Sequence, residues 1–190
     1  GDEVICHEEA HIYRYEGGGI ARNSGSSVRL LRGNSGRINP LEIEDNINPD
    51  DQHYPVTRMV SIEDTSNRGG GVIYDFNDIQ KISEICKKRN LKSHLDGARV
   101  FNALEVTKID PLVYGKQFDS ISVCLSKSLG APIGSLLLGD VDFIKKARRV
   151  RKVFGGGMRQ AGIIAAGGLF ALKNNIVRLS DDHKRAKQVE

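Results

Sequence analysis

The stretch that decides the fold runs from Phe118 to Gly134 and reads Phe-Asp-Ser-Ile-Ser-Val-Cys-Leu-Ser-Lys-Ser-Leu-Gly-Ala-Pro-Ile-Gly. Its apolar residues Ile121, Val123 and Leu125 alternate with small neutral ones, a pattern typical of a strand buried on both faces. Lys127 follows where this strand ends, beside a turn of small residues that could line a cavity. Partial desolvation there would favour a neutral amine, which can form a Schiff base. A solvated lysine that opens a turn is the alternative interpretation.

The rest of the chain repeats short apolar runs that alternate with loops and helical patterns. Further strands are predicted within residues 4–6, 28–31, 58–62, 91–95 and 134–139. Helices are predicted within residues 8–16, 40–47, 77–90, 98–106, 111–114, 143–154, 159–172 and 180–190. Asn77 is the predicted N-cap of the helix that reaches residue 90. This alternation predicts an α/β fold with a mixed, mostly parallel sheet flanked by helices.

The composition indicates one domain with a sizeable core, since 39% of the 190 residues are hydrophobic. No apolar run has the length of a membrane span, so no membrane partner is expected. The net charge of +4 is concentrated in residues 145–152, which hold six basic side chains and no acidic one. Phe143, Ala147, Val150 and Phe154 share one helical face, so the basic residues cover the other faces. A solvated face or an anion contact explains such a run, and nucleic acid is not expected because no aromatic residues are interleaved.

The cysteines, histidines and glycines argue against several other kinds of site. Cys6, Cys86 and Cys124 occur singly, which indicates reduced thiols in a cytoplasmic protein. His7 and His11 are four residues apart without a third partner, so no metal site is expected. The glycine clusters match neither a dinucleotide loop nor a nucleoside-triphosphate loop. The chain starts without Met and stops within a helical pattern, so a fragment of a longer protein is expected.

Polar residues directly follow two of the predicted strands. Residues 63–68 and three glycines come after the strand at 58–62, and Asp96 comes after the strand at 91–95. Such clusters are typical of a site at the carboxyl edge of an open sheet. Pyridoxal phosphate (PLP) enzymes pair a lysine that forms an imine with a carboxylate that keeps the pyridine nitrogen protonated. Asp96 and Lys127 suit these roles, although a turn or helix-cap role for Asp96 is equally open.

Six segments together resemble the threonine aldolase family of fold-type I PLP enzymes. They are Gly-Asp-Glu-Val-Ile (1–5), Ala-His-Ile-Tyr-Arg-Tyr-Glu (10–16), Asn-Arg-Gly-Gly-Gly (67–71), His-Leu-Asp-Gly-Ala-Arg (94–99), Cys-Leu-Ser-Lys-Ser-Leu-Gly-Ala-Pro-Ile-Gly-Ser (124–135) and Gly-Gly-Gly-Met-Arg-Gln-Ala-Gly (155–162). The resemblance runs in order over nearly the whole chain. It implies that residues 1–190 form the PLP-binding large domain of such an enzyme. The phosphate loop that precedes this domain in the family and the small domain that follows it would lie outside these residues.

The resemblance implies a role for each matching position. Lys127 would form the Schiff base with PLP, and Asp96 would hold the pyridine nitrogen. His11 would stack on the cofactor ring and act as a base or organise one, with Tyr15 beside it near the substrate. Arg99 would lie near the cofactor hydroxyl and the substrate carboxylate, which suits a planar guanidinium.

The resemblance also implies a reaction and an assembly. Thr65 would contact the substrate, while Lys152 and Arg159 match positions that reach a phosphate in a neighbouring subunit. A homodimer or homotetramer with shared sites is therefore implied. The expected reaction cleaves the Cα–Cβ bond of L-threonine or L-allo-threonine to give glycine and acetaldehyde. Another fold-type I lyase or transaminase, or a non-catalytic fragment of the scaffold, stays open as an alternative.

One segment departs from the family pattern. Where the family often has Glu-Asn-Thr-His-Asn, residues 63–67 read Glu-Asp-Thr-Ser-Asn. Ser66 thus replaces a histidine that is implicated near the substrate hydroxyl. The assignment of the base is therefore open at this position.

Overall fold

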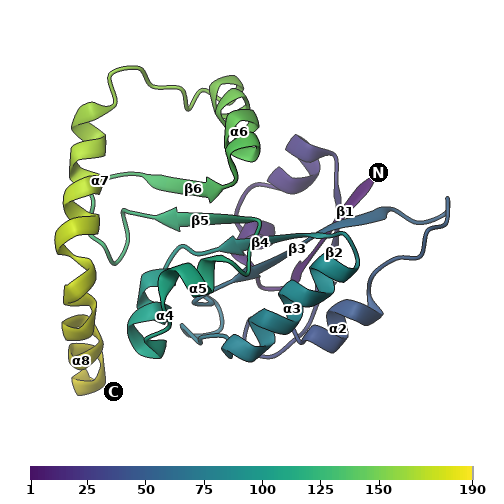
Figure 1. Ribbon diagram of the computed structural model, residues 1–190, viewed down its shortest axis with the longest axis horizontal. Coiled ribbons are helices and arrows are strands. Elements are labelled where there is room, and N and C mark those ends of the chain that lie inside the picture. Colours follow the sequence, from purple (N-terminus) through teal and green to yellow (C-terminus); the bar gives the residue numbers. More distant parts are fainter. Residues whose placement is uncertain (190) are drawn as a thin grey trace. The chain divides into compact units, whose positions relative to one another are not determined.

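The computed structural model describes residues 1–189 (Figure 1). The chain divides into two compact units. The first comprises Gly1–Asp96 and Asp110–Asp119, and the second comprises Gly97–Ile109 and Ser120–Glu190.

Four parallel strands in the order β2-β1-β3-β4 form the sheet of the first unit. They are β1 (Asp2–His7), β2 (Ser27–Leu31), β3 (Val56–Glu63) and β4 (Lys92–Asp96). In the register of β3 and β4, Glu63 lies opposite Asp96. Because neighbouring strands run in the same direction, the carboxyl ends of all four lie along one edge of this sheet.

Short helices connect and cover these strands. They are α1 (His11–Arg14), a π-helical turn η1 (Ile20–Ser24), α2 (Pro40–Asp45), α3 (Phe76–Lys88) and α5 (Pro111–Gly115). The helices α2 and α3 contact each other, and α3 also contacts β4 (Figure 1). The predicted cap of α3 is wrong, because the N-cap is Asp75, whose side chain accepts a hydrogen bond from the backbone N–H of Asn77 at 2.8 Å.

The core of the first unit lies between its strands and the helices α2 and α3. Its largest fully buried apolar side chains are Ile5, Ile43, Val60, Ile79, Ile82 and Leu95. Ile79, Ile82 and Cys86 recur at helical spacing on the buried face of α3. Branched side chains on the strands therefore pack against a single helical stripe.

The second unit contains an antiparallel strand pair and five helical segments. They are α4 (Val100–Thr107), β5 (Ser120–Cys124), β6 (Ser135–Gly139), α6 (Val141–Val153), α7 (Gly162–Asn174), η2 (Ile176–Arg178) and α8 (Leu179–Val189). Ile121 of β5 lies opposite Leu138 of β6. In Figure 1, α7 and α8 follow each other along the chain through the short η2 turn. The strands of the protein are mostly parallel with one antiparallel pair, which confirms the predicted α/β fold class.

Burial in the second unit differs from the prediction for its central strand. A small apolar cluster is formed by Leu125, Leu129, Ala131, Ala171 and Leu179. Val123 is buried, but Ile121, Ser122 and Cys124 are only half-buried. The expectation of burial on both faces was therefore wrong within this structure, and the neighbouring β6 is exposed along its whole length. Among residues 1–189, no helix combines the length and the apolar composition needed to cross a bilayer.

Candidate active site

The carboxyl edge of the first unit carries the predicted residues Asp96, His11, Tyr15 and Thr65. Asp96 is the last residue of β4 and is half-buried. The backbone N–H of Asp64, just beyond β3, donates to the carbonyl of Asp96 at 3.1 Å. The N-cap of α4 is Arg99, so the alternative role of Asp96 as that cap is not what the structure shows.

Glu63 fixes the segment that carries His11. Its side chain is buried, Oε2 accepts from the backbone N–H of His11 at 2.9 Å, and Oε1 accepts from the backbone N–H of Asn67 at 2.8 Å. Each bond has an ionic acceptor, which makes it stronger than a bond between neutral groups. The sequence placed Glu63 only within a polar cluster. A carboxylate that directly ends a buried apolar run is the signal that could have identified it.

The side chain of His11 stays accessible while its backbone is held. The imidazole Nδ1 lies 3.0 Å from the carboxylate Oε1 of Glu16, and the His11 side chain is 35% exposed. The ring of Tyr15 lies 5.0 Å from the His11 ring, centroid to centroid, at an interplanar angle of 38°. The two rings therefore lie side by side. Tyr15 also lines a pocket of about 550 Å³ together with Glu9, Asn67, Arg68 and Gly70.

The residue that departs from the family pattern is packed inside the first unit. Ser66 is 2% exposed, and its Oγ accepts from the backbone N–H of Gly69 at 3.2 Å. A Cβ added at Gly36 would lie 1.8 Å from the same oxygen, so the loop after β2 closes over Ser66. Thr65 is also buried. A buried serine with its oxygen already engaged is poorly placed to exchange protons with a substrate, which leaves His11 as the candidate base.

Lys127 and Arg99 lie in the second unit, on neighbouring segments. Lys127 follows β5 in a tight turn in which the backbone N–H of Gly130 donates to its carbonyl at 2.9 Å. The side chain of Asn102, in the first turn of α4 after Arg99, donates to Ser128 Oγ at 2.8 Å. This bond ties the start of α4 to the residue after Lys127. Lys127 itself is exposed, so the expected partial desolvation of its amine is not found in this structure.

The remaining predicted residues lie on and after the basic helix. Lys152 is in the last turn of α6, and Arg159 is in the loop between α6 and α7. Both are exposed, and the stem of Lys152 packs on Gly157. Arg148 and Arg151 of the same helix line a separate pocket of about 460 Å³ beside β6. Within residues 1–189, neither Lys152 nor Arg159 forms a hydrogen bond or ion pair with Lys127.

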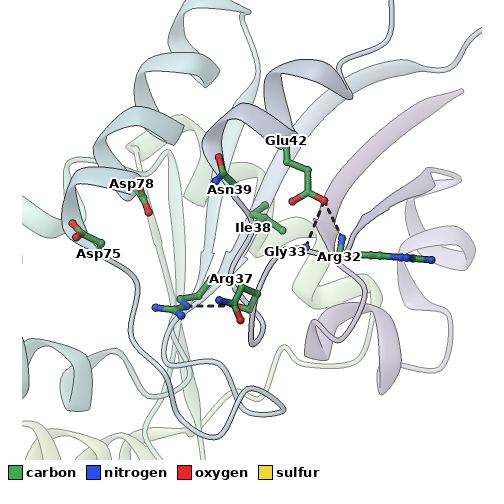
Figure 2. A pocket seen from close by; sticks show the side chains of 9 residues that line it. Arg32, Gly33, Arg37, Ile38, Asn39, Glu42, Asp75 and Asp78 are labelled. Atoms are coloured by element: carbon green, nitrogen blue, oxygen red, sulfur yellow. Dashed lines mark hydrogen bonds between the residues drawn. The ribbon is translucent and has the colours of Figure 1, made fainter.

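A second pocket in the first unit was not predicted (Figure 2). It measures about 460 Å³ and lies between the loop after β2 and the start of α3. Figure 2 shows the carboxylate of Glu42 turned toward the backbone N–H groups of Arg32 and Gly33, at 3.1 and 3.5 Å. Asp75 and Asp78 border the same pocket. Within residues 1–189, His, Cys, Asp and Glu side chains form no group of three or more that could hold a metal ion.

Comparison with known proteins defines the family. The model of the family described as Beta-eliminating lyase matches residues 1–190. A probable low-specificity L-threonine aldolase 2 from Arabidopsis thaliana is 40% identical over 98% of this chain and 54% of its own length. A low specificity L-threonine aldolase from Escherichia coli K12 is 41% identical over 98% of this chain and 55% of its own length. The chain therefore belongs to the beta-eliminating lyase family, and the resemblance to threonine aldolases is confirmed.

Solved structures agree with the fold. A structure described as a putative L-allo-threonine aldolase from Listeria monocytogenes superposes with a TM-score of 0.87 at 24% identity, covering 98% of this chain and 50% of that one. A PLP-bound putative aminotransferase from Clostridium difficile superposes with a TM-score of 0.70 at 12% identity, covering 98% of this chain and 48% of that one. The predicted fold-type I architecture is thus confirmed. The chain spans about half the length of the curated relatives that it matches.

Proposed function

We propose that the full-length protein is a PLP-dependent lyase that cleaves the Cα–Cβ bond of L-threonine or L-allo-threonine to give glycine and acetaldehyde. The observation that carries this proposal is the identity of about 40% to low-specificity L-threonine aldolases over 98% of the chain. The arrangement of Asp96, Glu63 and His11 at one sheet edge supports it. In open α/β sheets, ligands generally bind at the carboxyl edge of the strands.

The residues of the first unit suit PLP chemically. Asp96 presents a half-buried carboxylate at a strand end, where a cationic pyridine nitrogen would find an anion. The imidazole of His11 is partly exposed on a backbone that Glu63 fixes, so a ring could stack on it. Asp96 and His11 of this unit would hold the cofactor, together with Arg99 and Lys127 of the second unit. PLP, when bound, supplies an electron sink for the pair of electrons left on Cα as the bond breaks.

His11 is the proposed base for the β-hydroxyl group of the substrate. Its Nδ1 faces the carboxylate of Glu16 at 3.0 Å, which favours the tautomer with the proton on Nδ1. In this tautomer Nε2 carries the lone pair and accepts the hydroxyl proton. The proton then resides on an imidazolium whose charge Glu16 stabilises.

The other predicted residues would bind and orient the substrate. Arg99 would pair with the substrate carboxylate through its planar guanidinium. Tyr15 lines the pocket beside His11, and Thr65 lies in the segment that Glu63 anchors. These contacts would hold the hydroxyl group toward His11 while the Cα–Cβ bond is cleaved.

We also propose a cytoplasmic homodimer or homotetramer. Lys152 and Arg159, on and after the exposed basic helix, would reach a cofactor phosphate in a neighbouring subunit. Cys6 and Cys86 are buried free thiols, and burial raises the pKa of each to about 12. Inert core thiols suit a reducing compartment.

The test is cleavage of threonine by the full-length protein with PLP added. The expected products are glycine and acetaldehyde, with an absorbance band near the visible edge that Lys127→Ala abolishes. Lys173→Ala, at an exposed lysine of α7, serves as the matched control and should leave both signals unchanged. Ammonia and a keto acid as products, or full activity of Lys127→Ala, would contradict the proposal.

A further inference from the structure

Asp64 is a fully buried acid that directly follows β3 at the candidate site. Its side chain is 0% exposed. The hydroxyl of Tyr114, from α5, donates to Asp64 Oδ2 at 2.5 Å, and Oδ1 has no hydrogen-bond partner among the described residues. Buried polar atoms almost always have partners, so an unpartnered carboxylate oxygen requires an explanation.

Three separate segments converge on this side chain. Tyr114 comes from α5, and Tyr74 comes from the segment before α3, with its hydroxyl accepting from the backbone N–H of Ile38 at 2.8 Å. Arg37 comes from the loop after β2, and its guanidinium donates to the carbonyl of Ile73 at 3.2 Å. The Asp64 carboxyl thus lies where the loops that flank Thr65 meet.

The groups around Asp64 provide little stabilisation for a negative charge on its carboxyl group. Burial raises the pKa of Asp64 to about 6, although Tyr114, the backbone of Tyr74 and the charge of Arg37 oppose the rise. Burial also raises the pKa of both tyrosines, so their hydroxyls stay protonated. The guanidinium of Arg37 is turned to backbone carbonyls, and both oxygens of Glu63 are used by backbone N–H groups.

We propose that Asp64 is a positioning residue of the aldolase site, and that it holds the segment of Glu63 and Thr65 in place as a neutral carboxylic acid. A protonated carboxyl matches the shape of an asparagine amide and carries no charge. Unlike an amide, however, Asp64 loses its proton as the pH rises, and a buried charge then weakens the packing around Thr65.

This inference rests on the proposed function for its kinetic consequence. When Asp64 ionises, the loops around it loosen, and Thr65 and the His11 segment tied to Glu63 lose their fixed position. Glu63 and Asp96, which lie opposite each other at the same edge, both remain in a variant changed at residue 64. The effect should appear in kcat/KM, since the segment positions both Thr65 beside the substrate and the backbone of His11, the proposed base.

The experiment compares the full-length protein with Asp64→Asn, a neutral residue of the same shape. The kcat/KM for threonine cleavage is measured from pH 5 to pH 9, alongside the thermal midpoint at each pH. We expect a ratio of variant to wild type of about 1 at pH 5 that rises severalfold through pH 6 and then levels off. Tyr114→Phe, which removes the hydroxyl, should lower the midpoint at every pH.

The outcomes separate this inference from the proposed function. A ratio that does not change with pH, or an Asp64→Asn variant that is less active at every pH, overturns the inference. If the wild type yields no glycine from threonine, the proposed function fails, and the thermal midpoints still decide the role of Asp64. In that case the thermal midpoint of Asp64→Asn must still increase relative to that of the wild type as the pH rises through 6. A constant difference between the two midpoints would refute the inference.

Discussion

Replacement of Asp64 by asparagine should change how the free energy of unfolding depends on pH. Burial raises the pKa of Asp64 from its ordinary 3.8 to about 6, and the side chain is fully buried. A shift of about 2 units, at about 1.4 kcal/mol for each, corresponds to about 3 kcal/mol.

The sign follows from which state binds the proton. Between pH 3.8 and about 6 the folded state holds the proton of Asp64 and the unfolded state has released it. The contribution of Asp64 to stability is therefore full below the lower value, falls as the pH rises through this window, and is constant above it. Asp64→Asn lacks this titration. The stability of the variant relative to wild type should thus rise by about 3 kcal/mol between pH 3 and pH 7.

Urea unfolding at each pH measures this difference, with equal m-values as the check that both proteins unfold alike. Asp50→Asn is the matched control, because Asp50 is exposed in the loop before β3 and should give a curve parallel to wild type. Parallel curves for Asp64→Asn as well would refute the reasoning. They would mean that the carboxyl is either solvated or paired with a cation in the folded protein.

Three further substitutions test other contacts by urea unfolding. Glu63→Gln should destabilise by about 2 kcal/mol, since an amide has one oxygen for two backbone N–H groups; wild-type stability would contradict this. Gly36→Ala should cost more than Gly18→Ala, because both have positive φ but only the former brings a Cβ to 1.8 Å from Ser66 Oγ; equal losses would dismiss the close approach. Leu95→Ala should cost about 2–5 kcal/mol because Leu95 is fully buried, and a loss under about 1 kcal/mol would count against that burial.

The strands were predictable because each is a short apolar run that ends at polar or glycine residues. The strand predicted within residues 91–95 corresponds to β4 (Lys92–Asp96), and the strand predicted within residues 58–62 corresponds to β3 (Val56–Glu63). The cap of α3 was not predictable with the same certainty. Asp75 and Asn77 are both good cap residues two positions apart, and only the backbone conformation of Asp75 decides between them.

The site was predictable where chain order determines position and not where packing does. Asp96 at a strand end follows from the run before it. The bond from the backbone of His11 to Glu63 joins residues 52 positions apart, so no local pattern shows it. The sequence also placed Asp64 in a polar cluster, whereas Tyr114 and Tyr74 bury it from distant segments. The prediction for Lys127 was wrong for the opposite reason. The small residues around it were expected to leave its amine partly desolvated, but its side chain is exposed.

Glu63 and Asp64, at the end of β3, contact two different parts of the candidate site. Successive side chains of an extended strand point to opposite faces. Glu63 binds backbone N–H groups of the His11 and Asn67 segments, while Asp64 enters the buried cluster at Tyr114. Thr65 follows them in sequence and is held from both sides. A substitution at either acid should therefore disturb the same segment, but only Asp64 should make the disturbance depend on pH near 6.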